Sequence, residues 1–147
     1  MELSFSPAEI AARYADSGVA KTKRPTSQLI VLGLLAGALI ALGSAATNTA
    51  VYGIQDTWTA RTICGLLFPF GLGMVVVMGA ELFTGNSLIS ISVLDRRCSV
   101  SGMLRNWVIV YLSNFAGSLL VAAGCAFFVQ MGYSGGALAG YSMRVAA

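Results

Sequence analysis

The sequence lacks histidine altogether, and its few cysteines follow no metal-binding pattern. Without histidine, the chain has neither the commonest general base nor the commonest metal ligand. The three cysteines, Cys64, Cys98 and Cys125, form no CxxC pair, so we expect free thiols in apolar surroundings and no disulfide framework. No nucleophile–base pair and no metal cluster can be identified, so the sequence predicts no enzyme, no metal site and no cofactor.

Charge is scarce, and hydrophobic residues dominate in its place. Charged residues make up 10% of the chain and hydrophobic residues 56%, with a mean hydropathy of +0.77. These values are typical of a membrane protein. The nine basic residues form no stripe that would suit nucleic acid; they gather just outside the apolar runs, where they indicate membrane topology.

Residues 1–24 are the one polar segment, and we expect them to form a cytoplasmic amphipathic helix. Ser6-Pro7-Ala8-Glu9 has the form of a capping box, which predicts the start of that helix, and Gly18 is expected to end it. Ile10 and Tyr14 are four residues apart and share an apolar face. This face could lie on a membrane surface or on the protein's own cytoplasmic face.

Three largely apolar runs follow, each long enough to cross the ~30 Å hydrocarbon core of a membrane. The sequence predicts an all-α membrane protein with helices over about 26–46, 62–94 and 103–131. Residues 25–131 would form the transmembrane part. Residues 132–147 would be an extracytoplasmic Gly-rich tail or a linker to a second half.

The first run carries a GxxxG pair, Gly33 and Gly37, with Ala41 one turn further on. Small residues on one face of a helix allow the backbone of a neighbouring helix to approach closely. We interpret this face as ordinary helix packing and assign no function to it.

The basic residues indicate how the runs are oriented. Arg61 and Arg144 lie on one side of the predicted spans. The other seven lie on the opposite side: Arg13, Lys21, Lys23, Arg24, Arg96, Arg97 and Arg105. Because cytoplasmic flanks carry the excess of Lys and Arg, we expect a cytoplasmic N-terminus, and three spans would then place the C-terminal tail outside.

The second run has a polar stretch at its centre, Gly79-Ala80-Glu81-Leu82-Phe83-Thr84-Gly85-Asn86-Ser87. The apolar run of residues 63–94 contains 32 residues, and as one helix it would measure roughly 48 Å, too long for a single straight crossing. A charged side chain at its centre costs at least about 2.5 kcal/mol on insertion scales. We therefore expect the helix to break over 80–87 into a polar loop at mid-membrane, which faces a cavity or other protein.

Bulky apolar side chains stand beside a single hydroxyl in this stretch. Leu82 and Phe83 next to Thr84 are typical of a dry constriction with one hydrogen-bond donor. Equally, Leu82 and Phe83 could be plain core packing, and Thr84 and Asn86 could only satisfy loop backbone. We interpret Glu81 as a fixed cap that accepts hydrogen bonds from the freed N–H groups of the loop. An ionised Glu81 in an open pore would instead favour cations.

The ten residues VVMGAELFTG at 76–85 resemble the first signature of the formate/nitrite transporter family at every position. Arg105-Asn106-Trp107, with Tyr111 and Asn114, is similar to the family's third helix. The resemblance implies homopentamers in a bacterial or archaeal cytoplasmic (inner) membrane. Each protomer would have six helices in two inverted halves, an aquaporin-like arrangement with an omega-type loop, and one pore for formate, nitrite or hydrosulfide.

The resemblance also implies roles for single residues. By position, Leu82 would belong to the periplasmic constriction, Phe68, Leu72 and Phe83 to the cytoplasmic side, and Thr84 would meet the substrate between them. We expect the remaining residues, Glu81, Gly85 and Asn86, to stabilise the loop.

The chain departs from the family pattern in two respects. It resembles only the first half, and the central histidine that the family carries on its fifth helix is absent. We therefore expect a half-protein, either truncated or cleaved, or paired with a second half from another polypeptide. A three-helix homo-oligomer that builds its own pore is the less favoured interpretation.

Two other functions use the same features. A non-transporting membrane scaffold or assembly subunit could dock a partner helix on the polar loop. A water or glycerol channel would be expected to show Asn-Pro-Ala, whereas Asn86 is followed here by Ser87.

Overall fold

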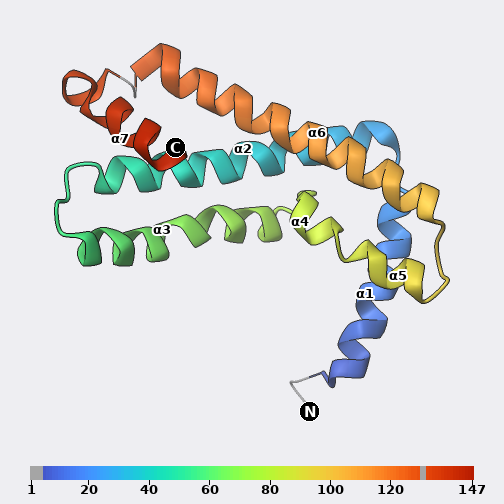
Figure 1. Cartoon of the computed structure of the whole chain (residues 1–147). Coiled ribbons are helices and arrows are strands. Elements are labelled where there is room, and N and C mark those ends of the chain that lie inside the picture. The colour runs from blue at the N-terminus through green and yellow to red at the C-terminus, as the bar shows by residue number, and fades with distance from the viewer. Residues whose placement is uncertain (1–4, 130–131) are drawn as a thin grey trace.

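A computed structural model of the chain describes residues 5–129 and 132–147, and every regular element in that part is a helix (Figure 1). Helices α2, α3 and the stretch Val100–Phe127 are long and apolar enough to cross a membrane. The prediction of an all-helical protein with three long apolar helices is thereby confirmed. The elements are α1 (Pro7–Thr22), α2 (Thr26–Val51), α3 (Thr57–Val77), α4 (Phe83–Asn86), α5 (Ile89–Leu94), α6 (Val100–Gly124), the π-helical turn η1 (Cys125–Val129), the 3-10 turn η2 (Tyr133–Gly136) and α7 (Ala137–Ala146).

Helix α2 is central, with α6 packed on one side and α3 on the other (Figure 1). Its glycine face meets α6 at backbone distance. A Cβ added at Gly37 would lie 2.0 Å from the carbonyl oxygen of Asn114, and one at Gly117 would lie 2.1 Å from that of Leu34. The close packing predicted from the GxxxG pair is confirmed, and the helix that packs on this face of α2 is α6.

The apolar core between α2 and α3 is small, so most of α3 remains uncovered. Buried Ala36 and Leu39 of α2 meet Val75 of α3. Large apolar side chains elsewhere on α3 are exposed, including Leu66 at 74% and Phe70 at 71%. A continuous apolar surface of this kind requires lipid or further protein around it.

Helix α1 begins as predicted and ends later than predicted. The capping box forms, since the Ser6 backbone N–H donates to Glu9 Oε2 at 2.8 Å and the Glu9 N–H donates to Ser6 Oγ. The expectation that Gly18 ends the helix is wrong, because α1 continues to Thr22. A Cβ at Gly18 would lie 2.0 Å from Ser92 Oγ, so this glycine serves close packing against α5.

Helix α1 packs on the protein itself, but through a different face from the one with Ile10 and Tyr14 that the sequence indicated. Ala15 and Gly18 are buried against α5, and the Ser92 hydroxyl donates to the Ala15 carbonyl at 2.8 Å. Ile10 and Tyr14 remain exposed on another side of the helix.

The second apolar run consists of α3, α4 and α5. Helix α3 starts at Thr57 and ends at Val77, and residues 78–82 lie outside both α3 and α4. Gly79 has a φ of 62°, a left-handed conformation that favours glycine, and it turns the chain out of α3. The turn brings the residues after it toward α1 and α6.

The predicted C-terminal tail contains a helix. Helix α7 buries Leu138, and the hydroxyls of Tyr52 and Ser134 lie 2.8 Å apart. Both contacts hold this segment beside the end of α2, which itself runs five residues past the predicted position 46, to Val51. The predicted end of the third apolar run, at 131, falls on residues 130–131, outside the described part of the chain.

Candidate functional site

The backbone of the loop between α3 and α4 is held by its neighbours. The Glu81 N–H donates to the Leu32 carbonyl of α2 at 3.2 Å. The Phe83 N–H donates to Asn114 Oδ1 of α6 at 2.9 Å. The N–H groups of Glu81 and of Phe83, the first residue of α4, therefore bind α2 and α6.

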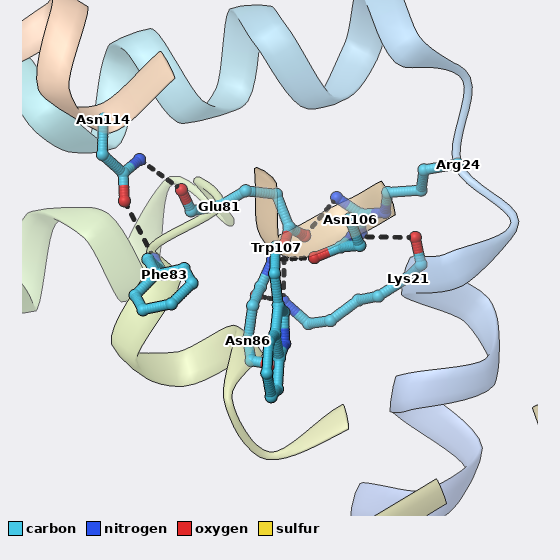
Figure 2. A network of polar contacts seen from close by, with 8 residues as sticks. All are labelled: Lys21, Arg24, Glu81, Phe83, Asn86, Asn106, Trp107 and Asn114. Carbon is cyan, nitrogen blue, oxygen red and sulfur yellow. Dashed lines mark hydrogen bonds and ion pairs between the residues drawn. The ribbon is translucent and has the colours of Figure 1, made fainter. Parts of the chain in front are cut away.

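The carboxylate of Glu81 pairs with two cations from the end of α1 and the linker after it. It is 1% exposed, and its oxygens lie 2.8 Å from Lys21 Nζ and 2.7 Å from Arg24 Nη1 (Figure 2). The interpretation of Glu81 as a cap on loop N–H groups is wrong, because those groups bind elsewhere. A buried carboxylate needs opposite charge or several hydrogen bonds, and here α1 and its linker supply the charge.

Asn86 joins α4 to α1 and α6 with its side chain and its backbone. Its Oδ1 accepts from Lys21 Nζ, and its Nδ2 donates to Asn106 Oδ1, both at 2.8 Å. Its carbonyl accepts from Trp107 Nε1 at 2.8 Å (Figure 2). The amide is fully buried, so these bonds satisfy a side chain that has no access to water.

Asn114 joins the loop to α2. Its Nδ2 donates to the carbonyls of Gly33 at 2.8 Å and Glu81 at 2.9 Å, while its Oδ1 accepts from Phe83. One amide of α6 thus binds the main chain on both sides of Leu82, at the Glu81 carbonyl and the Phe83 N–H.

A cavity of about 510 Å³ lies between α1, α3 and this loop. The walls include Lys21, Arg24 and Glu81, whose formal charges sum to +1. Thr84 lies on the wall with an exposed side chain, and its hydroxyl makes no hydrogen bond among the described residues. The remaining lining residues are Tyr14, Leu72, Val75, Val76, Gly79, Ala80, Leu82, Gly85, Asn86 and Leu88.

The structure brings some of the predicted pore residues together and separates others. Leu72, Leu82 and Thr84 share the cavity. Phe83 does not line it, because its ring packs edge-on against Trp107 and Tyr111, with ring centroids 6.1 and 5.4 Å apart.

Phe68 lies elsewhere, on the walls of two other cavities, of about 480 and 420 Å³, next to α7. Along α3 it precedes Leu72, on the side of the α2–α3 connection, and α1 lies at the opposite end (Figure 1). If α1 is on the cytoplasmic side, as the sequence predicts, Phe68 and Leu72 lie further outward than Leu82. The predicted cytoplasmic N-terminus therefore conflicts with the assignment of Leu82 to the periplasmic side and of Phe68 and Leu72 to the cytoplasmic side.

The three residues expected to stabilise the loop differ in the contacts that they make. Glu81 and Asn86 carry the polar network. Gly85 lines the cavity, and a Cβ there would meet nothing within 4 Å, so no described neighbour explains the glycine.

Sequence reasoning missed the partners of the loop. In the sequence, Lys21 and Arg24 indicate only membrane topology, although a carboxylate inside an apolar run indicates a need for opposite charge. Asn106 and Asn114 are eight residues apart on one apolar helix, a spacing that places both on a similar face. Among the described residues, no group of three potential metal ligands comes together.

Comparisons with known proteins agree on one family. A family model described as "Formate/nitrite transporter" matches residues 8–147. The chain is 37% identical over 122 residues to a "Probable formate transporter" of Methanothermobacter thermautotrophicus, which covers 80% of this chain and 44% of that protein. It is 39% identical over 119 residues to "Uncharacterized transporter YrhG" of Bacillus subtilis, 79% of this chain and 45% of that protein. It is 34% identical over 124 residues to "Formate channel FocA" of Haemophilus influenzae, 82% of this chain and 43% of that protein. The chain spans less than half the length of these relatives.

Proposed function

Since this chain belongs to the formate/nitrite transporter family, we propose that it forms one half of a membrane channel or transporter for small monovalent anions. Formate, nitrite and hydrosulfide are the candidate substrates. The family is one of transporters and not of enzymes, and three long apolar helices fit a multi-pass membrane protein. The alternative of a non-transporting scaffold is not favoured, because the relatives are named as transporters and channels.

The observation that carries the proposal is the free hydroxyl of Thr84 on the wall of a cavity with net positive charge. A hydroxyl can donate one hydrogen bond to an anion, and the surplus charge of Lys21 and Arg24 over Glu81 attracts anions to the same space. The sequence left open a cation-selective pore with an ionised Glu81. Pairing with two cations removes the reason for that selectivity.

The apolar walls of the proposed pore oppose the passage of a charged substrate. A carboxylate that leaves water for an apolar slit loses hydration worth several kcal/mol. A protonated weak acid such as formic acid avoids most of this loss, so a proton donor near Thr84 would speed passage. Thr84 cannot protonate a substrate at neutral pH. The donor would be the histidine that the family resemblance places in the second half.

The assembly follows from the surfaces left uncovered. The exposed apolar side chains of α3 and the open side of the cavity would face a second half, supplied by the same gene or by a separate chain. In this proposal the complete protomer forms a homopentamer in the cytoplasmic membrane. The N-terminus would be cytoplasmic, because seven of the nine basic residues lie in α1, the α1–α2 linker, the α5–α6 connection and the start of α6, at one end of the molecule (Figure 1).

Replacing Thr84 by Val in the intact transporter tests the proposal. The change removes the hydroxyl at nearly constant volume, and we expect formate flux into liposomes to fall about tenfold, the effect of one hydrogen bond lost at the constriction. Thr62→Val is the matched control, because Thr62 lies near the start of α3 and its hydroxyl bonds the Trp58 carbonyl. Equal flux through Thr84→Val and wild type would remove Thr84 from the pathway.

A further inference from the structure

Three consecutive residues of α6, Arg105, Asn106 and Trp107, bind the segments that form the cavity wall. Trp107 binds the Asn86 carbonyl, and Asn106 binds both the Asn86 amide and, at 3.2 Å, the Lys21 carbonyl. Arg105 reaches in another direction, to the linker between α1 and α2. Because successive side chains on a helix are about 100° apart, one turn of α6 can serve three elements.

The guanidinium of Arg105 binds the end of α1 and the start of α2. Its Nη1 and Nη2 both lie 3.3 Å from the Arg24 carbonyl, and Nη1 lies 3.4 Å from that of Thr22. Nη2 also donates to Thr26 Oγ1 at 2.6 Å. The last carbonyls of a helix lack partners within the helix and carry partial negative charge, so a guanidinium is a suitable cap.

The residues that Arg105 fixes are those that neutralise Glu81. Lys21 lies in the last turn of α1, and Arg24 lies in the linker that directly follows. The rest of α1 packs on α5, where Ala15 and Gly18 are buried and the Ser92 hydroxyl donates to the Ala15 carbonyl. Among the described residues, Arg105 and Asn106 supply the hydrogen bonds that run from α6 to this end of α1.

We propose that Arg105 is a positioning residue for the cationic cavity. Its planar fork fixes the α1–α2 linker, so that Lys21 and Arg24 both remain on Glu81 and present their surplus charge to the entering anion. The consequence for transport rests on the proposed function, whereas the clamp itself does not.

The fork and the charge of Arg105 can be separated. Arg105→Lys keeps the charge and loses the two-pronged geometry, and Arg105→Gln loses both. If position matters, both variants raise the half-saturating formate concentration about three- to tenfold and leave the maximal flux nearly unchanged, because Thr84 is not moved. The matched controls are Arg144→Lys and Arg144→Gln, since Arg144 is an exposed residue of α7 at the other end of the molecule.

A second measurement is independent of transport. Hydrogen exchange of the backbone amides of residues 20–24 should speed up about three- to tenfold in Arg105→Lys, because the cap on these carbonyls is weakened. It should not change in Arg144→Lys. In the Arg24→Gln background, Arg105→Lys should add little further increase to the half-saturating concentration, because both changes act on the same contact.

Several results would overturn the proposal or part of it. If Arg105→Lys matches wild type in amide exchange and in the half-saturating formate concentration, and only Arg105→Gln is impaired, charge alone matters and the proposal is overturned. Additive effects of Arg24→Gln and Arg105→Lys, or a loss of maximal flux alone, also overturn it. If the wild-type transporter carries no anion, the proposed function fails, and unchanged exchange would separately refute the clamp.

Discussion

The ammonium nitrogen of Lys21 lies 2.8 Å from Glu81 Oε2, although 60 residues separate the two in the chain. This contact ties the polar N-terminal helix to the loop that interrupts the second apolar run. The carboxylate is buried, and the lysine side chain is 25% exposed. The two partners therefore differ in what happens when the other is removed.

We expect neutralising the cations to be more harmful than neutralising the carboxylate. In the double variant Lys21→Gln with Arg24→Gln, Glu81 stays buried without opposite charge, at a cost of about 3–5 kcal/mol of unfolding free energy. Glu81→Gln leaves two partly hydrated cations and should cost only about 1–2 kcal/mol. Thermal unfolding in detergent measures both. The exposed Asp16–Arg97 pair provides the control, as Asp16→Asn should cost less than about 1 kcal/mol.

Asn114 should tolerate no change of its amide. Asn114→Asp keeps the shape but removes both donors to the carbonyls of Gly33 and Glu81, and we expect a loss of about 2–4 kcal/mol. Asn48 makes a single 3.4 Å contact with Ser142, so Asn48→Asp should lose much less. Similar melting temperatures for the two variants would argue against Asn114 as the anchor of the loop.

Replacing a glycine by alanine should have opposite effects on stability in α2 and in α3. Gly37→Ala would drive a methyl group to 2.0 Å from the Asn114 carbonyl and force the helices apart, which should cost about 1–3 kcal/mol or more. Gly73→Ala meets nothing within 4 Å, so in α3 it should gain up to about 1 kcal/mol from helix propensity. Unfolding in detergent would show shifts of opposite sign.

Leu82 and Phe83 should separate selectivity from stability. Leu82→Ala enlarges the cavity beside Thr84, and we expect it to raise acetate flux relative to formate flux. Phe83→Ala removes the ring contacts with Trp107 and Tyr111 and should lower stability by about 2 kcal/mol with little change in that ratio. A larger shift of the ratio in Phe83→Ala would return Phe83 to the pore lining.

The capping box of α1 gives a pH dependence with a definite sign. The backbone N–H of Ser6, and then its hydroxyl, donate to the carboxylate of Glu9 and lower the pKa of that group. A pKa that is lower in the folded than in the unfolded state stabilises the helix above the unfolded value. That stability is lost as the pH falls through the folded value. Amide exchange at the start of α1 should therefore be slower in wild type than in Glu9→Gln at pH 7, and the difference should shrink as the pH falls below the ordinary glutamate pKa of about 4.3. A ratio of the exchange rates of Glu9→Gln and wild type that stays constant with pH would contradict this prediction.

The parts of the fold that the sequence predicted depend on local patterns. The capping box at Ser6 and Glu9 and the long apolar runs involve neighbouring residues, and the structure shows both. Gly18 packs against Ser92, which is far away in the chain. The local sequence therefore suggests a helix end at Gly18, although this glycine serves close packing.

The candidate site could be predicted in its centre but not in its partners. Glu81 and Asn86 stand out because polar groups inside an apolar run need a reason. Their partners are Lys21 and Arg24 for Glu81 and Asn106 for Asn86. Which residues these partners are depends on how α1 and α6 pack. Residue spacing carries no information about such contacts across 20 to 65 positions.

The tether between the Leu32 carbonyl and the Glu81 N–H, like the bonds from Asn114, uses main-chain groups of residues 81 and 83. The main chain of the loop is thus fixed by its neighbours, and Leu82 packs beside the core of Ala36, Leu39 and Val75. The side chain of Thr84 takes no part in these contacts. If the proposed pore is correct, one substitution at position 84 would change which solute is favoured and leave these anchors in place.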